Sequence, residues 1–168
     1  GITYQMVDAD LMSYRLIQEP ASFDVIAAPN LFGDILADSA GVLVGSRGAT
    51  LSGNFDRSGN GIYQTNHGAA FDLEGKQIAN PTGQIFSAAM MLRESFGFME
   101  EAAAIEAAVR QVWSEGHLTA DMLPAGESPA GTGELGELIA EKAVDILRKH
   151  RTGSTKSAGH DASTACAG

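Results

Sequence analysis

Two aspartates, Asp34 and Asp38, stand one helical turn apart in the stretch NLFGDILADSAG. Side chains at i and i+4 share a helix face, with Cβ atoms roughly 6 Å apart, and like charges there disfavour an isolated helix. That spacing lets both carboxylates bind one cation, and such hard oxygen ligands favour Mg²⁺ or Mn²⁺ over zinc. The alternative is a solvated acidic face. Because the pair follows a predicted buried strand, where α/β proteins bind ligands, we favour a metal site.

A third aspartate, Asp8, follows another predicted strand in a similar position. Its carboxylate is a candidate third oxygen donor to the same kind of ion. An N-cap for the helix that begins at Ala9 also explains Asp8, and without further context it is the better explanation.

A second candidate site lies in the segment HGAAFDLEGK, where His67 opens a glycine-containing turn that leads to Asp72. A carboxylate at such a turn can accept hydrogen bonds from both hydroxyls of a ribose and repels a 2′-phosphate. An ordinary surface turn, in which Asp72 caps its own backbone, is an equal alternative. Asn80, which follows, is fully explained as a helix cap.

One formal motif match is rejected. Gly131–Gly136 fits the pattern G-x-G-x-x-G, but the preceding LPAGESPA cannot form a buried strand and no βαβ unit follows. We expect a flexible loop that leads into a helix, with Thr132 as its N-cap.

The elements that must position these residues alternate between strand and helix. Hydrophobic patterns predict strands at Ile2–Val7 and Phe23–Ala28, a helix at Ala9–Gln18, and another helix opening at Asn30. This alternation predicts α/β architecture.

The rest of the chain is predicted to be mainly helical. Glycine, serine and asparagine are frequent in Gly45–Gly61, which predicts a long loop. Helices are expected from Asn80 to Gly97, buried nearly all round, then at Met99–Trp113 and Glu134–His150. The small and polar residues 151–168 predict a disordered tail.

Composition excludes several classes of protein. The 168 residues carry a net charge of −10 without a basic stripe, which argues against nucleic acid as the partner. Neither a long apolar run nor a signal peptide is present, so we expect no membrane contact and a cytoplasmic location. The single cysteine, Cys166, rules out an internal disulfide and a cysteine metal cluster.

Two long segments resemble one known family. FDVIAAPNLFGDILADSAG is similar to the metal-binding strand and helix of the β-decarboxylating dehydrogenases, which include 3-isopropylmalate, isocitrate and homoisocitrate dehydrogenases, and HGAAFDLEGKQIANPTGQIFSAAMMLR is similar to their adenosine-binding loop and helix. The resemblance covers about Ile2–Leu147. It implies part of that family's three-layer α/β fold, with helices packed on a mixed β-sheet.

The resemblance also implies roles for the metal residues. Asp34 and Asp38 would bind the divalent metal that chelates the substrate's hydroxyl and carboxylate. Asp8 would complete the metal site of the partner subunit, so a homodimer is expected. The metal would polarise the C2 oxygen as hydride leaves and stabilise the enolate formed on loss of CO₂.

For the cofactor, the resemblance implies NAD. His67, Gly68 and Asn80 would form the adenine site, and Asp72 would hold the adenosine ribose and select NAD over NADP. The substrate would be a small 2-hydroxy acid, with 3-isopropylmalate favoured, as in leucine biosynthesis. Isocitrate, homoisocitrate and tartrate-like acids stay open as substrates, and so does a non-catalytic nucleotide-binding subunit of a hetero-oligomer.

The sequence also departs from the family pattern. Gln64 and Asn66 flank Thr65 where the family usually has Glu-Pro-x or Glu-Ala-x, and Phe71 replaces the customary proline before the aspartate. These departures leave the pose of the cofactor open.

The chain is also about half the family's length and is similar to its C-terminal part. Residues 1–44 would belong to the second domain, which carries the metal site and the dimer interface, and residues 45–150 to the first, cofactor-binding domain. The substrate-binding arginines and the tyrosine and lysine that transfer protons would lie outside these residues. We therefore expect the isolated chain to be inactive, and its unpaired strand edges to favour association.

Overall fold

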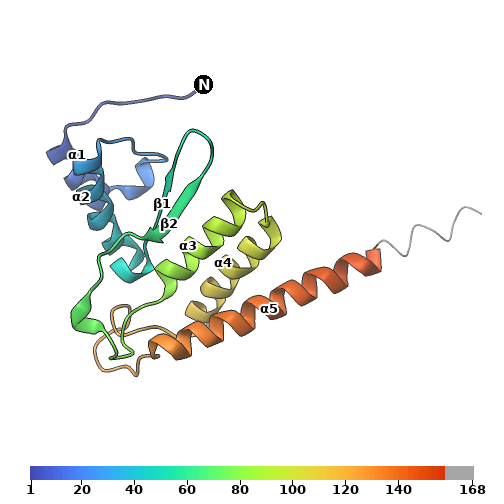
Figure 1. The fold of residues 1–168 in the computed structure, drawn as a ribbon. Coiled ribbons are helices and arrows are strands. Elements are labelled where there is room, and N and C mark those ends of the chain that lie inside the picture. The colour runs from blue at the N-terminus through green and yellow to red at the C-terminus, as the bar shows by residue number, and fades with distance from the viewer. Residues whose placement is uncertain (158–168) are drawn as a thin grey trace, which may run out of the picture.

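The computed structural model describes residues 1–157, and Figure 1 shows their arrangement. Two short helices lie at one end, a β-hairpin lies in the middle, and three longer helices follow. The elements in chain order are α1 (Ala9–Gln18), η1 (Pro20–Ser22), α2 (Asn30–Ala40), η2 (Gly41–Val44), η3 (Arg47–Ala49), β1 (Leu51–Phe55), β2 (Gly61–Thr65), η4 (Phe71–Leu73), α3 (Thr82–Glu94), α4 (Met99–Ser114) and α5 (Thr132–Ser157).

Helices α1 and α2 form a small unit with its own core. Met12 and Leu16 of α1 pack against Leu36 of α2, and all three are buried. The predicted bounds of α1 and the predicted start of α2 at Asn30 are confirmed. The unit therefore sets the orientation of the α2 face that carries the two aspartates.

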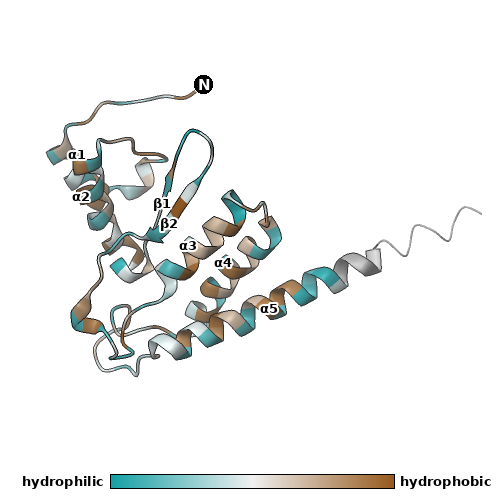
Figure 2. Ribbon diagram, viewed as in Figure 1, coloured by the Kyte–Doolittle hydropathy of each residue, from teal (hydrophilic) through white to brown (hydrophobic). Residues whose placement is uncertain are grey.

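The two predicted strands beside this unit are wrong. Residues 2–7 and 23–28 run extended, but neither segment pairs with another within residues 1–157. A strand needs a neighbour for its backbone hydrogen bonds, and none of the described residues supplies one. Val7 and Phe23 pack against the core of the α1–α2 unit, but other apolar side chains of the two segments are left in solvent: Ile2, Tyr4, Met6 and Val25 are each at least 86% exposed. Figure 2 shows this hydrophobic N-terminal segment lying apart from the helices.

The prediction of one long loop at Gly45–Gly61 is also wrong, because η3 and β1 lie within it and β2 begins at its last residue. Strand β1 pairs antiparallel with β2, with Leu51 opposite Thr65 and Phe55 opposite Gly61. The glycines permit close packing: a Cβ at Gly53 would lie 2.7 Å from Met90 Sδ of α3. The described residues thus hold helices packed on a two-stranded sheet, a partial α/β fold of the expected class.

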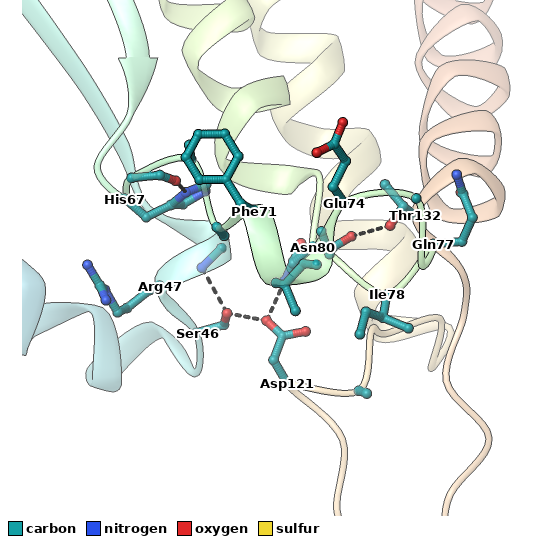
Figure 3. A pocket seen from close by; sticks show the side chains of 18 residues that line it. Ser46, Arg47, His67, Phe71, Glu74, Gln77, Ile78, Asn80, Asp121 and Thr132 are labelled. Atoms are coloured by element: carbon teal, nitrogen blue, oxygen red, sulfur yellow. Dashed lines mark hydrogen bonds between the residues drawn. The ribbon is translucent and has the colours of Figure 1, made fainter.

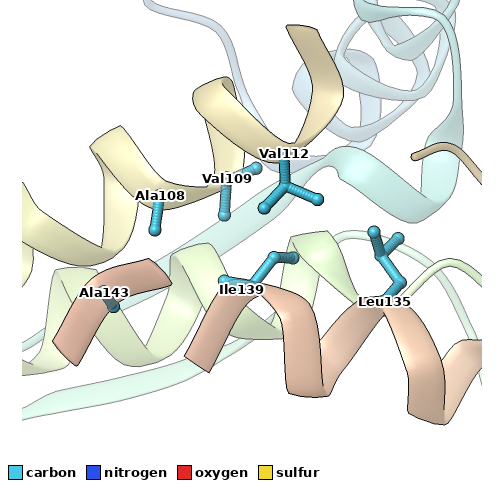
Figure 4. Packing of buried hydrophobic residues seen from close by; sticks show 6 residues of the cluster. All are labelled: Ala108, Val109, Val112, Leu135, Ile139 and Ala143. Atoms are coloured by element: carbon cyan, nitrogen blue, oxygen red, sulfur yellow. The ribbon is translucent and has the colours of Figure 1, made fainter. Parts of the chain in front are cut away.

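Helices α3, α4 and α5 form the larger core. Figure 4 shows small and branched side chains of α4 facing those of α5. The members of this cluster are Ala108, Val109, Val112, Leu135, Ile139 and Ala143. The third predicted helix is confirmed to within one residue, and none of the helices in residues 1–157 is long and apolar enough to cross a membrane.

The ends of α3 follow from local chemistry. The helix begins at Thr82, two residues after the predicted start, and Asn80 Oδ1 accepts a hydrogen bond from the Thr82 backbone N–H at 3.1 Å. At the other end Gly97 has φ +68°, a left-handed conformation that glycine adopts without strain. The helix is buried mainly at its first turn and at Ser87 and Ala89, so the expected burial all round is only partly met.

Helix α5 extends beyond both predicted ends. Thr132 is its first residue rather than its N-cap, and the helix continues to Ser157, so the predicted disorder is wrong for 151–157. Two contacts support the extension: Arg151 pairs with Glu101 of α4 at 3.0 Å, and Thr152 Oγ1 donates to Arg148 O at 2.9 Å. Residues 158–168 of the predicted tail lie outside the described residues.

Candidate functional site

A pocket of about 920 Å³ opens where four segments meet. Its walls come from residues 46–48 at η3, the loop of residues 67–80, residues 120–121 between α4 and α5, and Thr132 at the start of α5. Figure 3 shows these side chains around the cavity. The whole pocket is therefore built by residues that follow the α1–α2 unit in the chain.

Close backbone contacts hold the base of the pocket together. A Cβ on Gly83, in the first turn of α3, would lie 2.4 Å from Thr50 O and 2.7 Å from Gly48 O. A Cβ on Gly48 would lie 2.6 Å from Asn80 Cβ. These distances leave no room for a side chain at either glycine, so α3 and η3 can approach this closely only through glycine.

The loop of residues 67–80 is fastened to α5 at its far end. Gln77 O accepts a hydrogen bond from Thr132 N at 3.0 Å, and Gln77 Oε1 accepts one from Gly133 N at 3.1 Å. Thr132 Oγ1 donates to Ala79 O at 2.6 Å. Gln77 thereby satisfies two N–H groups of the α5 first turn. It does so with φ +56°, an uncommon conformation for a residue other than glycine.

The structure brings three of the four expected cofactor residues into this pocket. His67, Gly68 and Asn80 line it, and His67 Nδ1 lies 2.8 Å from Gly68 O. Asp72 is exposed on η4, between Phe71 and Leu73, which both line the pocket. Asp72 therefore stands beside the cavity rather than in its wall.

Asn80 is held by a network at the junction of α3, η3 and the α4–α5 loop. Its Nδ2 donates to Asp121 Oδ2 at 3.3 Å and contacts Met122 Sδ at 3.1 Å, while its Oδ1 accepts from Thr82 Oγ1 at 2.6 Å. Ser46 Oγ donates to the same Oδ2 of Asp121. The network joins three segments that are distant in the sequence, and Figure 3 shows the two bonds that Ser46 and Asn80 make to Asp121.

Asp121 is the pocket residue that sequence reasoning missed. Partial burial raises the pKa of its carboxyl, but hydrogen bonds from Ser46, Thr119 and Asn80 together outweigh this, so the pKa lies below its ordinary value. The carboxylate is thus ionised at neutral pH. Two of its partners, Ser46 and Asn80, are 75 and 41 positions away, so the local sequence alone does not place this carboxylate in the pocket.

The three aspartates expected at a metal do not gather in one cluster. Asp34 is exposed on α2, whereas Asp38 is half-buried, with Oδ2 2.7 Å from Arg47 Nη2 and Oδ1 3.3 Å from Asn66 Nδ2. Asp8 occupies the N-cap position of α1, but its side chain makes no capping hydrogen bond. No group of three potential metal ligands occurs within the part of the chain that the structure describes.

A nucleotide cofactor and a divalent metal therefore fit the described residues to different degrees. The pocket offers apolar walls together with hydrogen-bonding groups, as nucleotide sites require. The α2 face offers two carboxylates of the right chemistry for Mg²⁺ or Mn²⁺, but one of them is occupied by Arg47. A complete metal site needs ligands beyond those that residues 1–157 bring together.

Comparison with known proteins agrees with this architecture. The model of the isocitrate/isopropylmalate dehydrogenase family matches residues 1–139, and the chain belongs to that family. It is 45% identical over 140 residues to a 3-isopropylmalate dehydrogenase of Haemophilus influenzae, covering 83% of this chain and 39% of that protein. It is 47% identical to one of Sodalis glossinidius over 131 residues, 78% of this chain and 36% of that protein.

Solved structures show the same fold. An isocitrate dehydrogenase from Methylococcus capsulatus matches with a TM-score of 0.75 at 40% identity, covering 80% of this chain and 39% of that one. A β-decarboxylating dehydrogenase from Thermococcus kodakarensis matches with a TM-score of 0.70 at 39% identity, covering 83% and 40%. The chain thus spans about two fifths of the length of these relatives.

Proposed function

We propose that this chain is the C-terminal part of an NAD- and divalent-metal-dependent enzyme that oxidatively decarboxylates a 2-hydroxy acid, with 3-isopropylmalate as the substrate. The names of the relatives in Haemophilus and Sodalis support the substrate. The observation that carries the proposal is the pocket, in which His67, Gly68 and Asn80 meet beside Asp72. Isocitrate, homoisocitrate and tartrate are the alternative substrates.

In this proposal the pocket holds the adenosine end of NAD. His67 and Gly68 form one wall, and Asn80 forms the base. Asp72 accepts hydrogen bonds from both ribose hydroxyls and repels a 2′-phosphate, so it favours NAD over NADP. The exposure of Asp72 leaves its carboxylate available to a ligand.

The α2 face supplies the metal ligands Asp34 and Asp38. When bound, the metal supplies a Lewis acid at the substrate oxygen, and NAD supplies the hydride acceptor. Asp38 must give up its ion pair with Arg47 to bind a cation. Asp8 is assigned to the metal site of the partner subunit in a homodimer, which accounts for its separation from the other two aspartates.

The proposal also covers the domain organisation of the chain, its cellular location and its partners. Two separate hydrophobic clusters, one in α1–α2 and one in α4–α5, support assigning residues 1–44 to the metal domain and residues 45–150 to the cofactor domain. We place the protein in the cytoplasm, acting on a small molecule and without a nucleic acid or membrane partner. Its net charge of −10 supports the exclusion of nucleic acid.

Equilibrium binding to the 168-residue chain tests the cofactor assignment. We expect NAD to bind at least about tenfold more tightly than NADP, because a carboxylate and a phosphate repel each other. Asp72→Asn should narrow that ratio, while Asp24→Asn, which removes the same charge from an exposed position between η1 and α2, should preserve it. An unchanged ratio in the Asp72 variant would contradict the assignment.

A non-catalytic nucleotide-binding subunit is the second candidate, and one observation favours it. The pocket is built wholly within this chain, whereas a complete metal ligand set is not brought together by the described residues. Both candidates predict that the isolated chain binds NAD without turnover. Formation of NADH by the isolated chain with Mn²⁺ and a 2-hydroxy acid would contradict our assignment of the proton-transfer residues to another part of the protein.

A further inference from the structure

Asn60 and Gly61 stand at the end of the turn that joins β1 to β2. Asn60 is exposed, and Figure 1 shows the turn projecting away from α3. No other asparagine in the sequence precedes a glycine. The carbonyl carbon of an asparagine side chain can be attacked by the backbone nitrogen of the next residue, and a glycine places no side chain in the way. The turn therefore brings together the two groups that deamidation requires.

The register of the hairpin directs the Gly61 N–H away from β1. Asp56 N donates to Asn60 O at 3.0 Å, which makes residues 56 and 60 a hydrogen-bonded pair. Phe55 and Gly61 form the next pair along the strands. Bonded and non-bonded pairs alternate in an antiparallel ladder, so the Gly61 N–H points outward from β2. This nitrogen is therefore not held by the partner strand.

Packing makes glycine necessary at position 61. A Cβ there would lie 2.5 Å from Tyr63 Oη and 2.6 Å from Tyr63 Cζ. Tyr63 has partners of its own, because its Oη lies 2.8 Å from Ser95 Oγ and its ring meets Phe55 edge-on. The glycine that exposes Asn60 to attack is thus required by the packing of the hairpin.

Asp56 holds the Asn60 side chain across the turn. Its Oδ2 accepts from Asn60 Nδ2 at 2.8 Å, and its Oδ1 accepts from the backbone N–H groups of Asn60 and Ser58 at 2.9 and 2.8 Å. The hydrogen bonds from Asn60 contribute most to lowering the pKa of the Asp56 carboxyl, which is therefore ionised at neutral pH. A carboxylate in place of the Asn60 amide would set a second negative charge against it.

We propose that Asn60 is a site of deamidation, with Gly61 N as the nucleophile and water as the co-reactant. The nitrogen of Gly61 bonds to Asn60 Cγ and gives up its proton, and the side-chain nitrogen leaves as ammonia. Water then opens the cyclic imide and gives aspartate or isoaspartate at position 60. One water is consumed, one ammonia is released, and the residue gains a negative charge without a change in oxidation state.

Peptide mapping by mass spectrometry tests the proposal on the unmodified 168-residue chain, incubated at mildly alkaline pH. Asn54 is an internal control, because it is exposed in the same hairpin but precedes Phe55. We expect Asn60 to deamidate at least about tenfold faster than Asn54, because Gly61 has no side chain to hinder the attack. An isoaspartate-specific methyltransferase should label the same peptide. Equal rates at the two asparagines, or labelling of other peptides alone, would overturn the proposal.

Comparison of the folded chain with the chain in urea tests the argument from register and needs no variant. We expect the two rates at Asn60 to agree within about tenfold, because the Gly61 N–H already points outward in the folded hairpin. Stronger protection by folding would show that the hairpin blocks the attack and would overturn the proposal.

The restraint by Asp56 is tested by removing it. Asp56→Ala should speed the deamidation of Asn60 about threefold, because the amide loses one hydrogen bond. Asp24→Ala removes the same charge from an exposed position outside the hairpin and should leave the rate unchanged. An equal rate in the two variants would contradict the role of Asp56.

The product should loosen the turn. Asn60→Asp sets a carboxylate opposite Asp56, so we expect hydrogen exchange of the Asp56 N–H to become about threefold faster. Gln64→Glu adds the same charge near the other end of β2 and should leave this exchange rate unchanged. An unchanged exchange rate in Asn60→Asp would overturn the effect on the turn, while the rates at Asn60 and Asn54 decide whether the site is modified.

Discussion

The pocket and the α2 aspartate face differ in how completely this chain builds them. Backbone contacts and hydrogen bonds between four segments of residues 45–157 form the pocket. The orientation of the α2 face depends on a small core of three buried residues. The Asp38 side chain on that face makes polar contacts with Arg47 and Asn66. On the proposed assignments, this comparison indicates that the nucleotide half of the site is built by one stretch of chain, whereas the metal half needs ligands beyond those that the described residues bring together.

Core truncations should give the largest effects and separate the two regions. Leu135→Ala removes a fully buried side chain between α4 and α5, and should lower the free energy of unfolding by about 3 kcal/mol. Leu36→Ala, in the smaller core, should cost about 2 kcal/mol and leave NAD affinity unchanged. Urea unfolding followed by circular dichroism measures both changes. Loss of NAD binding in the folded Leu36 variant would contradict the claim that the pocket forms independently of the α1–α2 core.

A substitution at the base of the pocket should lower the free energy of unfolding by an intermediate amount. Gly83→Ala forces a Cβ against two backbone oxygens and should cost about 2 kcal/mol while weakening NAD binding. Gly136→Ala is the matched control, because its Cβ meets open space on α5 and should stabilise the helix by about 0.8 kcal/mol. Equal thermal stability of the two variants would show that α3 and η3 are not packed as described.

Removal of the Arg47 charge should give the smallest change in stability. It tests whether Arg47 competes with a metal ion for Asp38 on the α2 face. The exposed pair with Asp38 contributes less than about 1 kcal/mol, so Arg47→Gln should unfold almost as the unmodified chain does. Mn²⁺ affinity should rise, because Asp38 loses its competing cation. Arg57→Gln removes an equal charge from the hairpin turn and is the control. A rise in the control alone would contradict the role of Arg47.

The sequence predicted the helices well and the strands poorly. Helix bounds depend on periodicity and caps close in sequence, so α1 and α4 were predicted to within one residue. The extended segments 2–7 and 23–28 have apolar patterns typical of strands, but pairing depends on partners that the described residues do not provide. The hairpin β1–β2 was missed because its glycines, which allow packing on α3, have the composition of a loop.

Some residues of the candidate sites could be predicted from the sequence, and others could not. His67, Gly68 and Asn80 lie within fourteen consecutive positions, so one motif could place them together. Asp121 acquires its position from Ser46 and Asn80, which are distant in the sequence, so only the folded chain reveals it. Asp38 was predicted as a metal ligand, and its ion pair with Arg47 depends on packing that the helical spacing cannot predict.

The most direct test of this account is calorimetric titration of ADP-ribose into the 168-residue chain, with and without Mn²⁺. The account predicts saturable binding with a Kd below about 1 mM in both conditions, because the pocket is complete without the metal site. Absence of binding, or binding that requires Mn²⁺, would contradict the claim that this chain alone builds the nucleotide half of the site.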